Sequence, residues 1–303
     1  MATVAETIRE TTREHLLSGK GKLFGQCVSA VGWVGGTIPE LTEKEGIVEL
    51  ALSDCSNAGM PIGAALAGTR PIYVVRYQGF LWYNAVSLIN YAAKSKEMWG
   101  VSCPVFIRAI AMEGNIGPVA TSSEHSMVMR KPGMAVYAPM TSGEWLETYE
   151  YFMANTDPMF CSEHRKSFAL TGYPVTEGYN GDEDITIFAI SAARLSAQEA
   201  QKELIECGIK CNIFPVWKLK PLGIPALGYK SLYNSGIGLV IDSDNEICGA
   251  SEHIANHLMM ETRIPVHTLG VQDRTAGFAA HLDNGTPTAE MIVRKVRDIV
   301  ESK

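Results

Sequence analysis

Short apolar runs alternate with segments of helical period along most of this chain, and this alternation limits the folds open to it. Runs typical of buried strands occupy residues 72–77, 104–110, 158–162, 185–190, 210–215, 238–242 and 265–269. Segments with the apolar spacing of amphipathic helices occupy residues 81–98, 143–154, 196–207, 249–261 and 288–300. Such alternation is typical of parallel sheets covered by helices. We therefore predict an α/β fold.

A turn-rich, acidic stretch interrupts this alternation around residues 171–184. Its glycines, proline, asparagine and aspartates are the residues that mark loops and linkers. A chain of 303 residues also exceeds the roughly 100–200 residues of an ordinary domain. We predict two domains, residues 1–175 and 180–303, each a mostly parallel sheet flanked by helices.

Charge and hydropathy argue against two classes of partner. The net charge is −7 and no cluster of Lys and Arg offsets it, so we expect no nucleic-acid partner. No apolar run approaches the roughly 18 residues of a membrane-spanning helix, so we expect no membrane partner. The first ten residues have the pattern of a polar amphipathic helix and not that of a signal peptide.

The seven cysteines, spread from Cys27 to Cys248, follow no disulfide framework. An odd number of scattered cysteines is typical of reduced thiols in the cytoplasm. Cys207 and Cys211 lie four residues apart, but no histidine or second cysteine pair completes a zinc site. We predict a cytoplasmic protein with no metal site of its own.

A single acid, Asp54, stands at the head of a segment rich in Ala and Gly, residues 58–68. Small side chains let another backbone or a flat ring approach closely. A lone carboxylate is also stabilised near a helix N-terminus. Because Asp before Ser and Asn is a common helix cap, the local pattern leaves two interpretations open, a binding residue and a capping residue.

Two segments with little periodicity, residues 114–124 and 219–229, are expected to form loops. In α/β folds, function collects at loops beyond the carboxyl ends of the strands. His125 and Ser126 directly follow the first loop, so they lie where chemistry is expected. A lone histidine that caps or packs is the alternative.

Several motifs recur in an order and spacing that point to one known family. They are Leu23–Val28, Gly63–Pro71, Ile89–Lys94, Pro104–Arg108, Glu124–Ser126, Lys131–Val136, Asp157–Phe160, Trp217–Leu222, Gly270–Arg274 and Thr288–Glu290. In these motifs the chain resembles the beta subunit of the thiamine-diphosphate-dependent decarboxylase component of 2-oxoacid dehydrogenases, a branch of the transketolase superfamily. The resemblance covers nearly the whole chain. It implies a thiamine-diphosphate-binding fold followed by a transketolase C-terminal-like domain.

The resemblance also implies that this chain is half of an enzyme. Its first domain would bind the aminopyrimidine ring of thiamine diphosphate. An alpha subunit would hold the diphosphate and Mg²⁺ through a Gly-Asp-Gly…Asn motif, and this chain has no Gly-Asp-Gly. The expected assembly is an α2β2 heterotetramer, with a lipoyl acyltransferase as a candidate further partner.

The chief departure from the family concerns the catalytic acid. A carboxylate hydrogen-bonded to N1′ of the pyrimidine favours the reactive imino form of the cofactor, and in the family this acid is Glu. The resemblance assigns the role to Asp54, whose shorter side chain withdraws the carboxylate by roughly 1.5 Å. Leu52 occupies the place whose backbone lies against the pyrimidine, and Phe80 that of an aromatic residue packed on the ring. Gln26 replaces an acidic residue near the pyrimidine.

Two more residues are assigned by the same resemblance. Arg76 replaces a family Gln close to the cofactor and would recognise an anionic substrate, with a structural ion pair as the alternative. His125 matches the histidine of a family Gln-His-Ser segment that assists substrate or acyl transfer. The neighbouring Glu124 would favour the protonated imidazole if the two side chains converge.

These assignments leave two reactions and two other classes of protein open. We favour decarboxylation of a 2-oxoacid with acyl transfer, and a split transketolase or carboligase that forms C–C bonds is the alternative. A non-catalytic assembly subunit with a decayed site is the second alternative. A nucleotide-binding Rossmann protein has little support, because no Gly-x-Gly-x-x-Gly follows the first strand.

Overall fold

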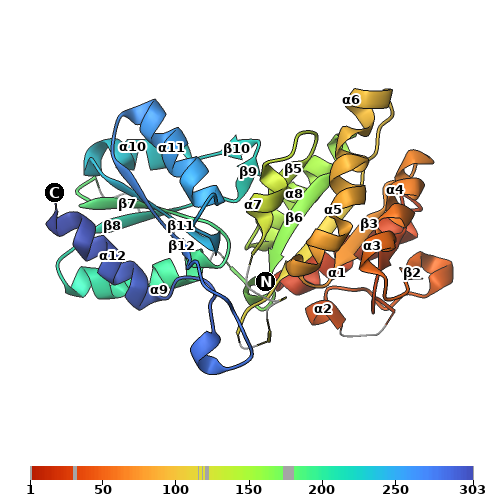
Figure 1. The fold of residues 1–303 in the computed structure, drawn as a ribbon, viewed down its shortest axis with the longest axis horizontal. Helices are drawn as coiled ribbons and strands as arrows, with labels where there is room; N and C mark the ends of the chain where they lie inside the picture. Colours follow the sequence, from red (N-terminus) through yellow and green to blue (C-terminus); the bar gives the residue numbers. More distant parts are fainter. Residues whose placement is uncertain are drawn as a thin grey trace. The chain divides into compact units, whose positions relative to one another are not determined.

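The structure, a computed structural model, describes residues 2–29, 33–114, 116–117, 119, 123–172 and 181–302. The chain divides into two compact units (Figure 1). The first unit consists of residues 1–112 and 127–172, and the second of residues 113–126 and 173–303. The predicted division between residues 175 and 180 falls on positions outside the described residues, and it stays a prediction.

The first unit holds a parallel sheet whose strands run in the order β5-β6-β4-β3-β1-β2. Its strands are β1 (Leu23–Gly25), β2 (Ile47–Glu49), β3 (Ile72–Val75), β4 (Phe106–Ala111), β5 (Ala135–Tyr137) and β6 (Met159–His164). Its α-helices are α1 (Val4–Leu17), α2 (Trp33–Gly36), α3 (Asp54–Asn57), α4 (Gly59–Leu66), α5 (Leu81–Asn90), α6 (Ser95–Trp99) and α8 (Ser142–Ala154), while α7 (His125–Met129) begins in the second unit. Short 3₁₀ turns are η1 (Glu43–Glu45), η2 (Gln78–Phe80), η3 (Ala92–Lys94) and η4 (Arg165–Ser167).

Strand alternation places helices on both faces of this sheet. Phe106 of β4 packs on Trp145 and Phe152 of α8, with ring centroids 5.9 and 5.0 Å apart. Tyr73, on the neighbouring strand β3, points the other way and donates a hydrogen bond of 2.7 Å to Asn84 of α5. Because successive side chains of a strand face opposite sides, α8 and α5 cover opposite faces. Helix α1 packs on α8, and α3 and α4 pack on α5.

The second unit holds a parallel four-stranded sheet in the order β12-β11-β7-β8. Its strands are β7 (Ile185–Ala189), β8 (Cys211–Pro215), β11 (Gly238–Asn245) and β12 (Val266–Val271), and β9 (Lys218–Lys220) pairs antiparallel with β10 (Leu222–Gly223). Its helices are α9 (Ala193–Glu206), α10 (Ala226–Ser235), α11 (Ala250–Thr262), α12 (Ala289–Glu301) and the 3₁₀ turn η5 (Ala280–Leu282).

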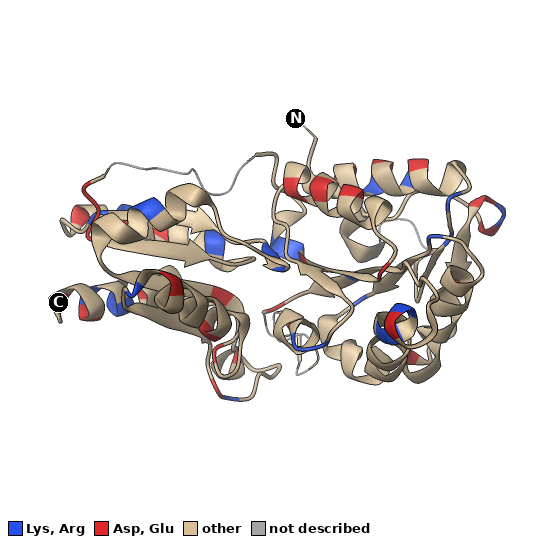
Figure 2. Cartoon of the chain, turned by 90° about the horizontal axis from the view of Figure 1, so that it is seen from above, with Lys and Arg blue, Asp and Glu red and all other residues tan. Residues whose placement is uncertain are grey.

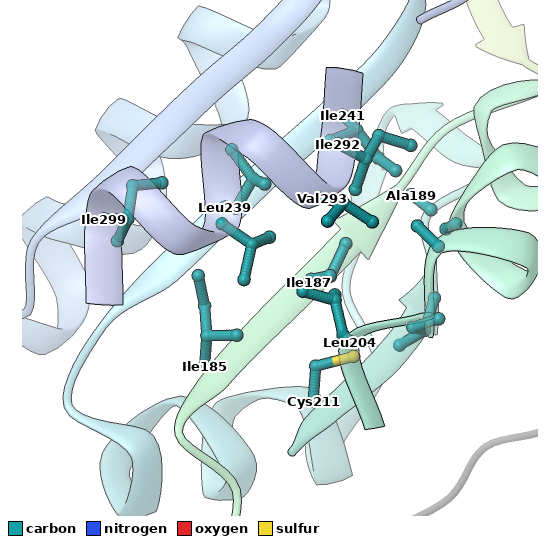
Figure 3. Packing of buried hydrophobic residues seen from close by; sticks show 14 of the residues in the cluster. Ile185, Ile187, Ala189, Leu204, Cys211, Leu239, Ile241, Ile292, Val293 and Ile299 are labelled. Carbon is teal, nitrogen blue, oxygen red and sulfur yellow. The ribbon is translucent and has the colours of Figure 1, made fainter. Parts of the chain in front are cut away.

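One apolar core joins this sheet to α9 and α12. In Figure 3, Ile292, Val293 and Ile299 of α12 lie over residues of β7 and β11. The alternate β7 residues Thr186 and Phe188 face α10 instead, since Thr186 shares a hydrogen bond of 2.7 Å with Ser231. The sheet is therefore covered on both faces, which confirms the predicted α/β architecture of parallel sheets flanked by helices.

Two sequence predictions differ from the structure. The helix expected over residues 81–98 is divided into α5, η3 and α6. Ala92 and Ala93 are buried at the break, and the carbonyl of Ala93 approaches Gly133, where a Cβ atom would meet it at 1.7 Å. This close backbone contact explains the glycine, which has φ of 73°.

Residues 219–229, expected as a loop, instead contain β10 and the start of α10. Leu219 is buried and pairs with Leu222 in the hairpin of β9 and β10. The segment has no apolar periodicity, so tertiary contacts and not a local sequence pattern determine its structure. Among the described residues, no helix is both long and apolar enough to cross a membrane.

Candidate functional site

The carboxyl ends of three adjacent parallel strands gather most of the predicted site residues. Strand β1 lies between β2 and β3 in the sheet. Gln26 follows β1, Leu52 and Asp54 follow β2, and Arg76 and Phe80 follow β3. Parallel strands end at a common edge of the sheet, so residues far apart in the sequence share one edge, where ligands of α/β proteins bind.

Asp54 is the first residue of α3, and Ser53 occupies the capping position. The capping interpretation of Asp54 is therefore wrong. Its Oδ1 atom instead accepts a hydrogen bond of 3.0 Å from Nε2 of Gln26. This bond joins two of the predicted site residues, and the side chains of both are half-buried.

Phe80 is positioned by hydrogen bonds that begin at Tyr73, a residue close enough to Asp54 to feel its charge. Burial, and after it the negative charge of Asp54, raises the pKa of the Tyr73 hydroxyl above its usual value. Tyr73 donates to Asn84, and Nδ2 of Asn84 donates to the carbonyl oxygen of Phe80 at 3.1 Å. Phe80 keeps its ring half-exposed, 5.8 Å from the ring of Tyr77.

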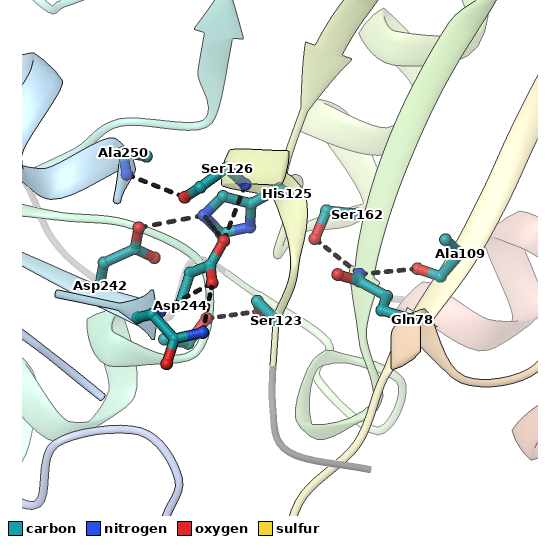
Figure 4. A network of polar contacts seen from close by, with 11 residues as sticks. Gln78, Ala109, Ser123, His125, Ser126, Ser162, Asp242, Asp244 and Ala250 are labelled. Carbon is teal, nitrogen blue, oxygen red and sulfur yellow. Dashed lines mark hydrogen bonds and ion pairs between the residues drawn. The ribbon is translucent and has the colours of Figure 1, made fainter. Parts of the chain in front are cut away.

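Gln78 fixes the turn that carries Phe80. Its buried side chain donates to the carbonyl oxygen of Ala109 at 3.0 Å and to the hydroxyl of Ser162 at 2.8 Å (Figure 4). These two residues belong to β4 and β6, so η2 is tied to the centre of the sheet. Phe80 is thus held by contacts on both sides of its turn.

Arg76 and Leu52 complete this edge in different ways. Arg76 donates to Sγ of Cys27 at 3.3 Å, and its guanidinium carbon lies 5.5 Å from the centre of the Tyr77 ring. Leu52 keeps 82% of its surface exposed. A leucine this exposed, beside a half-buried acid, offers apolar surface to a ligand or to another chain.

Glu49 is not among the predicted site residues, yet its hydrogen bonds hold the loop after β1. Its carboxylate accepts hydrogen bonds from the backbone N–H of Cys27, and from those of Val28 and Ser29 at 2.9 Å each. Partial burial raises the pKa of Glu49, but the bonds from Ser29, Cys27 and Val28 outweigh it and leave the pKa below its usual value. Cys27 has φ of 56°, so the carboxylate supports a strained turn next to Gln26. An acid at the end of a three-residue strand gives no sequence signal for this role.

His125 belongs to the second unit, whereas the other predicted site residues belong to the first. Its side chain is fully buried. Its Nε2 atom is 3.0 Å from Oδ2 of Asp242, near the end of β11 (Figure 4). The partners are therefore aspartates more than a hundred residues away, and the adjacent Glu124 contributes less to the charge on the ring.

The residues after β1, β2 and β3 fit an aminopyrimidine ring by their chemistry. Such a ring needs one carboxylate for its ring nitrogen and apolar or aromatic surface for its faces. Asp54 supplies the carboxylate, and Leu52 and Phe80 supply accessible apolar surface at the same sheet edge. Within the described residues, no cluster of three or more His, Cys, Asp and Glu side chains is arranged to hold a metal ion.

Comparison with known families matches both units. The family profile of the transketolase pyrimidine-binding domain matches residues 29–169, and that of the transketolase C-terminal domain matches residues 178–292. Together the two profiles span most of the chain, in the order of the two units.

Curated relatives share 21–26% of their residues with this chain. The beta subunit of acetoin:2,6-dichlorophenolindophenol oxidoreductase from Cupriavidus necator is 26% identical over 75% of this chain and 71% of its own length. The beta subunit of 2-oxoisovalerate dehydrogenase from Bacillus subtilis is 25% identical over 83% of each chain. The beta subunit of the pyruvate dehydrogenase E1 component from Rickettsia bellii is 23% identical over 98% of each.

A solved structure has the same fold. It is a split-gene transketolase, described as an inactive beta4 tetramer, and it superposes with a TM-score of 0.73 over 99% of this chain and 98% of its own. At 17% identity, this likeness concerns the fold alone.

Proposed function

The chain belongs to the transketolase family, with its pyrimidine-binding and C-terminal domains, and on that premise we propose that it is the beta subunit of a thiamine-diphosphate-dependent enzyme that acts on a 2-oxoacid. The observation that carries the proposal is Asp54, held by Gln26 at the carboxyl ends of β1 and β2. The beta subunits of pyruvate and 2-oxoisovalerate dehydrogenases among its relatives support the substrate class.

Asp54 and Gln26 would act together on the pyrimidine. Bound thiamine diphosphate supplies an electron sink for breaking or forming a bond next to a carbonyl group. Asp54 would hold the proton shared with N1′ of the pyrimidine, the role that a family Glu fills. Gln26 is uncharged, so it does not repel the carboxylate of Asp54. Its amide donates to Oδ1 of Asp54, which would orient the carboxylate and leave Oδ2 for the cofactor.

Leu52, Phe80 and Arg76 would form the rest of the site. Leu52 and Phe80 would contact the two faces of the pyrimidine with apolar and aromatic surface. Arg76 would bind an anionic group of the substrate, such as the carboxylate of a 2-oxoacid, because a guanidinium matches a carboxylate in shape and charge. The contact with Cys27 keeps Arg76 near Gln26 at the same edge.

An uncharged surface on the first unit supports a partner subunit. Helices α4 and α5 contain no Asp, Glu, Lys or Arg, although both have exposed positions. Their exposed apolar residues are Met60, Leu66, Trp82, Tyr83 and Val86. Elsewhere, acidic and basic residues are interspersed over both units (Figure 2). Exposed apolar surface of this extent marks interaction sites.

We assign that surface to an alpha subunit that binds the diphosphate and Mg²⁺, in an α2β2 heterotetramer. The missing Gly-Asp-Gly motif requires such a partner for the cofactor. A lipoyl acyltransferase would receive the acyl group if the reaction is that of a dehydrogenase. We place the complex in the cytoplasm, because all seven cysteines, each within the described residues, are free thiols.

A split transketolase or carboligase remains the alternative reaction. Gly270–Arg274 and Thr288–Glu290 resemble the transketolase C-terminal domain. Purified complex supplied with 2-oxoacids and an artificial electron acceptor, and then with aldehydes, separates the two reactions. Reduction of the acceptor supports the dehydrogenase, and a ketol product formed only with aldehydes supports the transferase.

The role of Asp54 is tested by Asp54→Asn in the complex co-expressed with its alpha subunit. Loss of the carboxylate removes the proton relay, so we expect turnover to fall by roughly 10²–10⁴-fold. Asp157→Asn is the matched control, since Asp157 forms an exposed ion pair with Lys96 and should leave turnover unchanged. Full activity of Asp54→Asn would show that the acid has no catalytic role and would favour a non-catalytic assembly subunit.

A further inference from the structure

A histidine between two aspartates is buried in the second unit. The exposed fractions are 0% for His125, 0% for Asp242 and 2% for Asp244. Nε2 of His125 lies 3.0 Å from Oδ2 of Asp242 and 3.7 Å from Oδ2 of Asp244. Both aspartates belong to β11, whereas His125 is the first residue of α7. The three side chains thus connect two segments that are distant in the sequence.

Serines on both sides of the histidine reinforce this connection. The backbone N–H of Ser126 donates to Oδ2 of Asp244 at 2.7 Å, and its hydroxyl accepts from the N–H of Ala250 at 2.8 Å. Ser123 donates its N–H to the carbonyl oxygen of Ser243 at 3.1 Å and shares a hydrogen bond of 2.7 Å with the Ser243 hydroxyl. Figure 4 shows these bonds converging around His125. Residues 123–126 are therefore joined to the end of β11 and the start of α11.

A positive charge on His125 would balance the buried carboxylates of this cluster. Two neighbouring buried carboxylates repel one another, and an unpaired buried charge is strongly destabilising. Among the described residues, Oδ1 of Asp242 has no hydrogen-bond partner, so the charge of Asp242 is balanced through Oδ2 and His125. At 3.0 Å, Nε2 of His125 is placed to donate to the carboxylate of Asp242, and such a hydrogen bond is stronger when the ring is an imidazolium.

We propose that Asp242 and Asp244 hold His125 as an imidazolium at neutral pH, and that this ionic anchor fixes residues 123–126 on the second unit. His125 would then act through its charge and its position, because an imidazolium carries a proton on both ring nitrogens and has no free lone pair to accept another from a substrate. The anchor depends only on residues of this chain, so it stands whether or not the proposed function is correct.

The groups that set the charge of His125 come from two places. Asp242 and Asp244 act from β11, and Glu124 acts more weakly from the segment of His125 itself. Burial alone would lower the pKa of His125, but the two aspartates outweigh it and raise the pKa to about 9. Burial raises the pKa of Asp244, and His125 opposes that rise. The anchor should therefore hold at neutral pH and release as the pH rises through 9.

The test is a histidine NMR titration of the full chain labelled with [¹³C]histidine. The chain has seven histidines, and His125→Gln identifies the resonance of His125 by its loss. We expect His125 to titrate near 9 in the wild type. In Asp242→Asn we expect its pKa to fall by about one to three pH units, since an opposite charge has been removed. Asp298→Asn, on the exposed side of α12, is the control and should leave the pKa unchanged.

A second measurement needs no substitution, and so it remains decisive if Asp242→Asn fails to fold. Hydrogen exchange of peptides that contain residues 123–129, corrected for intrinsic rates, should rise in the wild type between pH 7 and pH 10. A histidine that titrates near its ordinary pKa, or residues 123–129 that stay equally protected across this range, would overturn the proposal.

Discussion

Two buried, hydrogen-bonded histidines of this protein, His15 in the first unit and His125 in the second, have pKa values shifted in opposite directions. In the first unit, His15 of α1 lies between the carbonyl oxygen of Arg70, 2.7 Å from Nε2, and the hydroxyl of Tyr149, 2.9 Å from Nδ1. The carbonyl can only accept, so Nε2 carries the proton and the neutral Nδ1 accepts from Tyr149. In the second unit, His125 faces two carboxylates.

The comparison shows that burial does not decide the charge of a histidine. Burial lowers the pKa of His15 to about 4, with the nearby positive charges of Lys20 and Arg70 acting in the same direction. His125 is more deeply buried, yet the aspartates raise its pKa to about 9. Partner atoms decide the difference, because dipoles accommodate a neutral ring whereas carboxylates stabilise a charged one.

The largest effect is expected from His125→Leu. This substitution leaves Asp242 and Asp244 buried together without their cation, and breaking a buried ion pair in this way costs roughly 3–5 kcal/mol of unfolding free energy. Urea denaturation measures the loss, and hydrogen exchange should assign it to peptides of β11 and residues 123–126. Unchanged stability would mean that the two aspartates are not held as charged partners of His125.

The pH dependence of the two units should be opposite in sign. The pKa of His125 lies above the unfolded value of 6.5, so its stabilisation is complete below pH 6.5 and is lost as the pH rises through 9. The pKa of His15 lies below 6.5, so its unit loses stability as the pH falls from 6.5 towards 4. Each change corresponds to roughly 3 kcal/mol.

Hydrogen exchange at pH 5, 7 and 9, corrected for intrinsic rates, compares the two units in one sample. Peptides of α1 and α8 should lose protection at pH 5, and peptides of β11 at pH 9. Parallel loss of protection in both units at either pH would contradict the comparison.

A smaller effect is expected from His15→Phe. Phenylalanine fills the space of the ring but leaves the carbonyl of Arg70 and the hydroxyl of Tyr149 without their partner, at a cost of about 1–3 kcal/mol. The variant should also lose the acid sensitivity of the first unit, because the titrating group is gone. Thermal unfolding at pH 7 and pH 5 measures both effects; a variant as acid-sensitive as the wild type would show that another group titrates there.

The longer elements of the fold could be predicted from the sequence, and the shortest could not. The apolar runs correspond to β3, β4, β6, β7, β8, β11 and β12, and the periodic segments to α8, α9, α11 and α12. Strands β1, β2 and β5 have three residues each, too few to show a period of two. Gln26 directly follows β1, and Glu49 is the last residue of β2. Because these strands could not be predicted, the residues around Asp54 could not be predicted from the sequence pattern either.

The sequence by itself determined the alternation of the longer strands and helices and the position of Asp54 at the head of the segment rich in Ala and Gly, because both depend on residues only a few positions apart. Only the tertiary structure decided the partners of the two residues predicted to be catalytic, Asp54 and His125. Gln26 is 28 positions from Asp54, and Asp242 is 117 positions from His125. A side chain's charge and orientation depend on the groups within a few ångströms of it, and for these residues the fold, not the neighbouring sequence, supplies those groups.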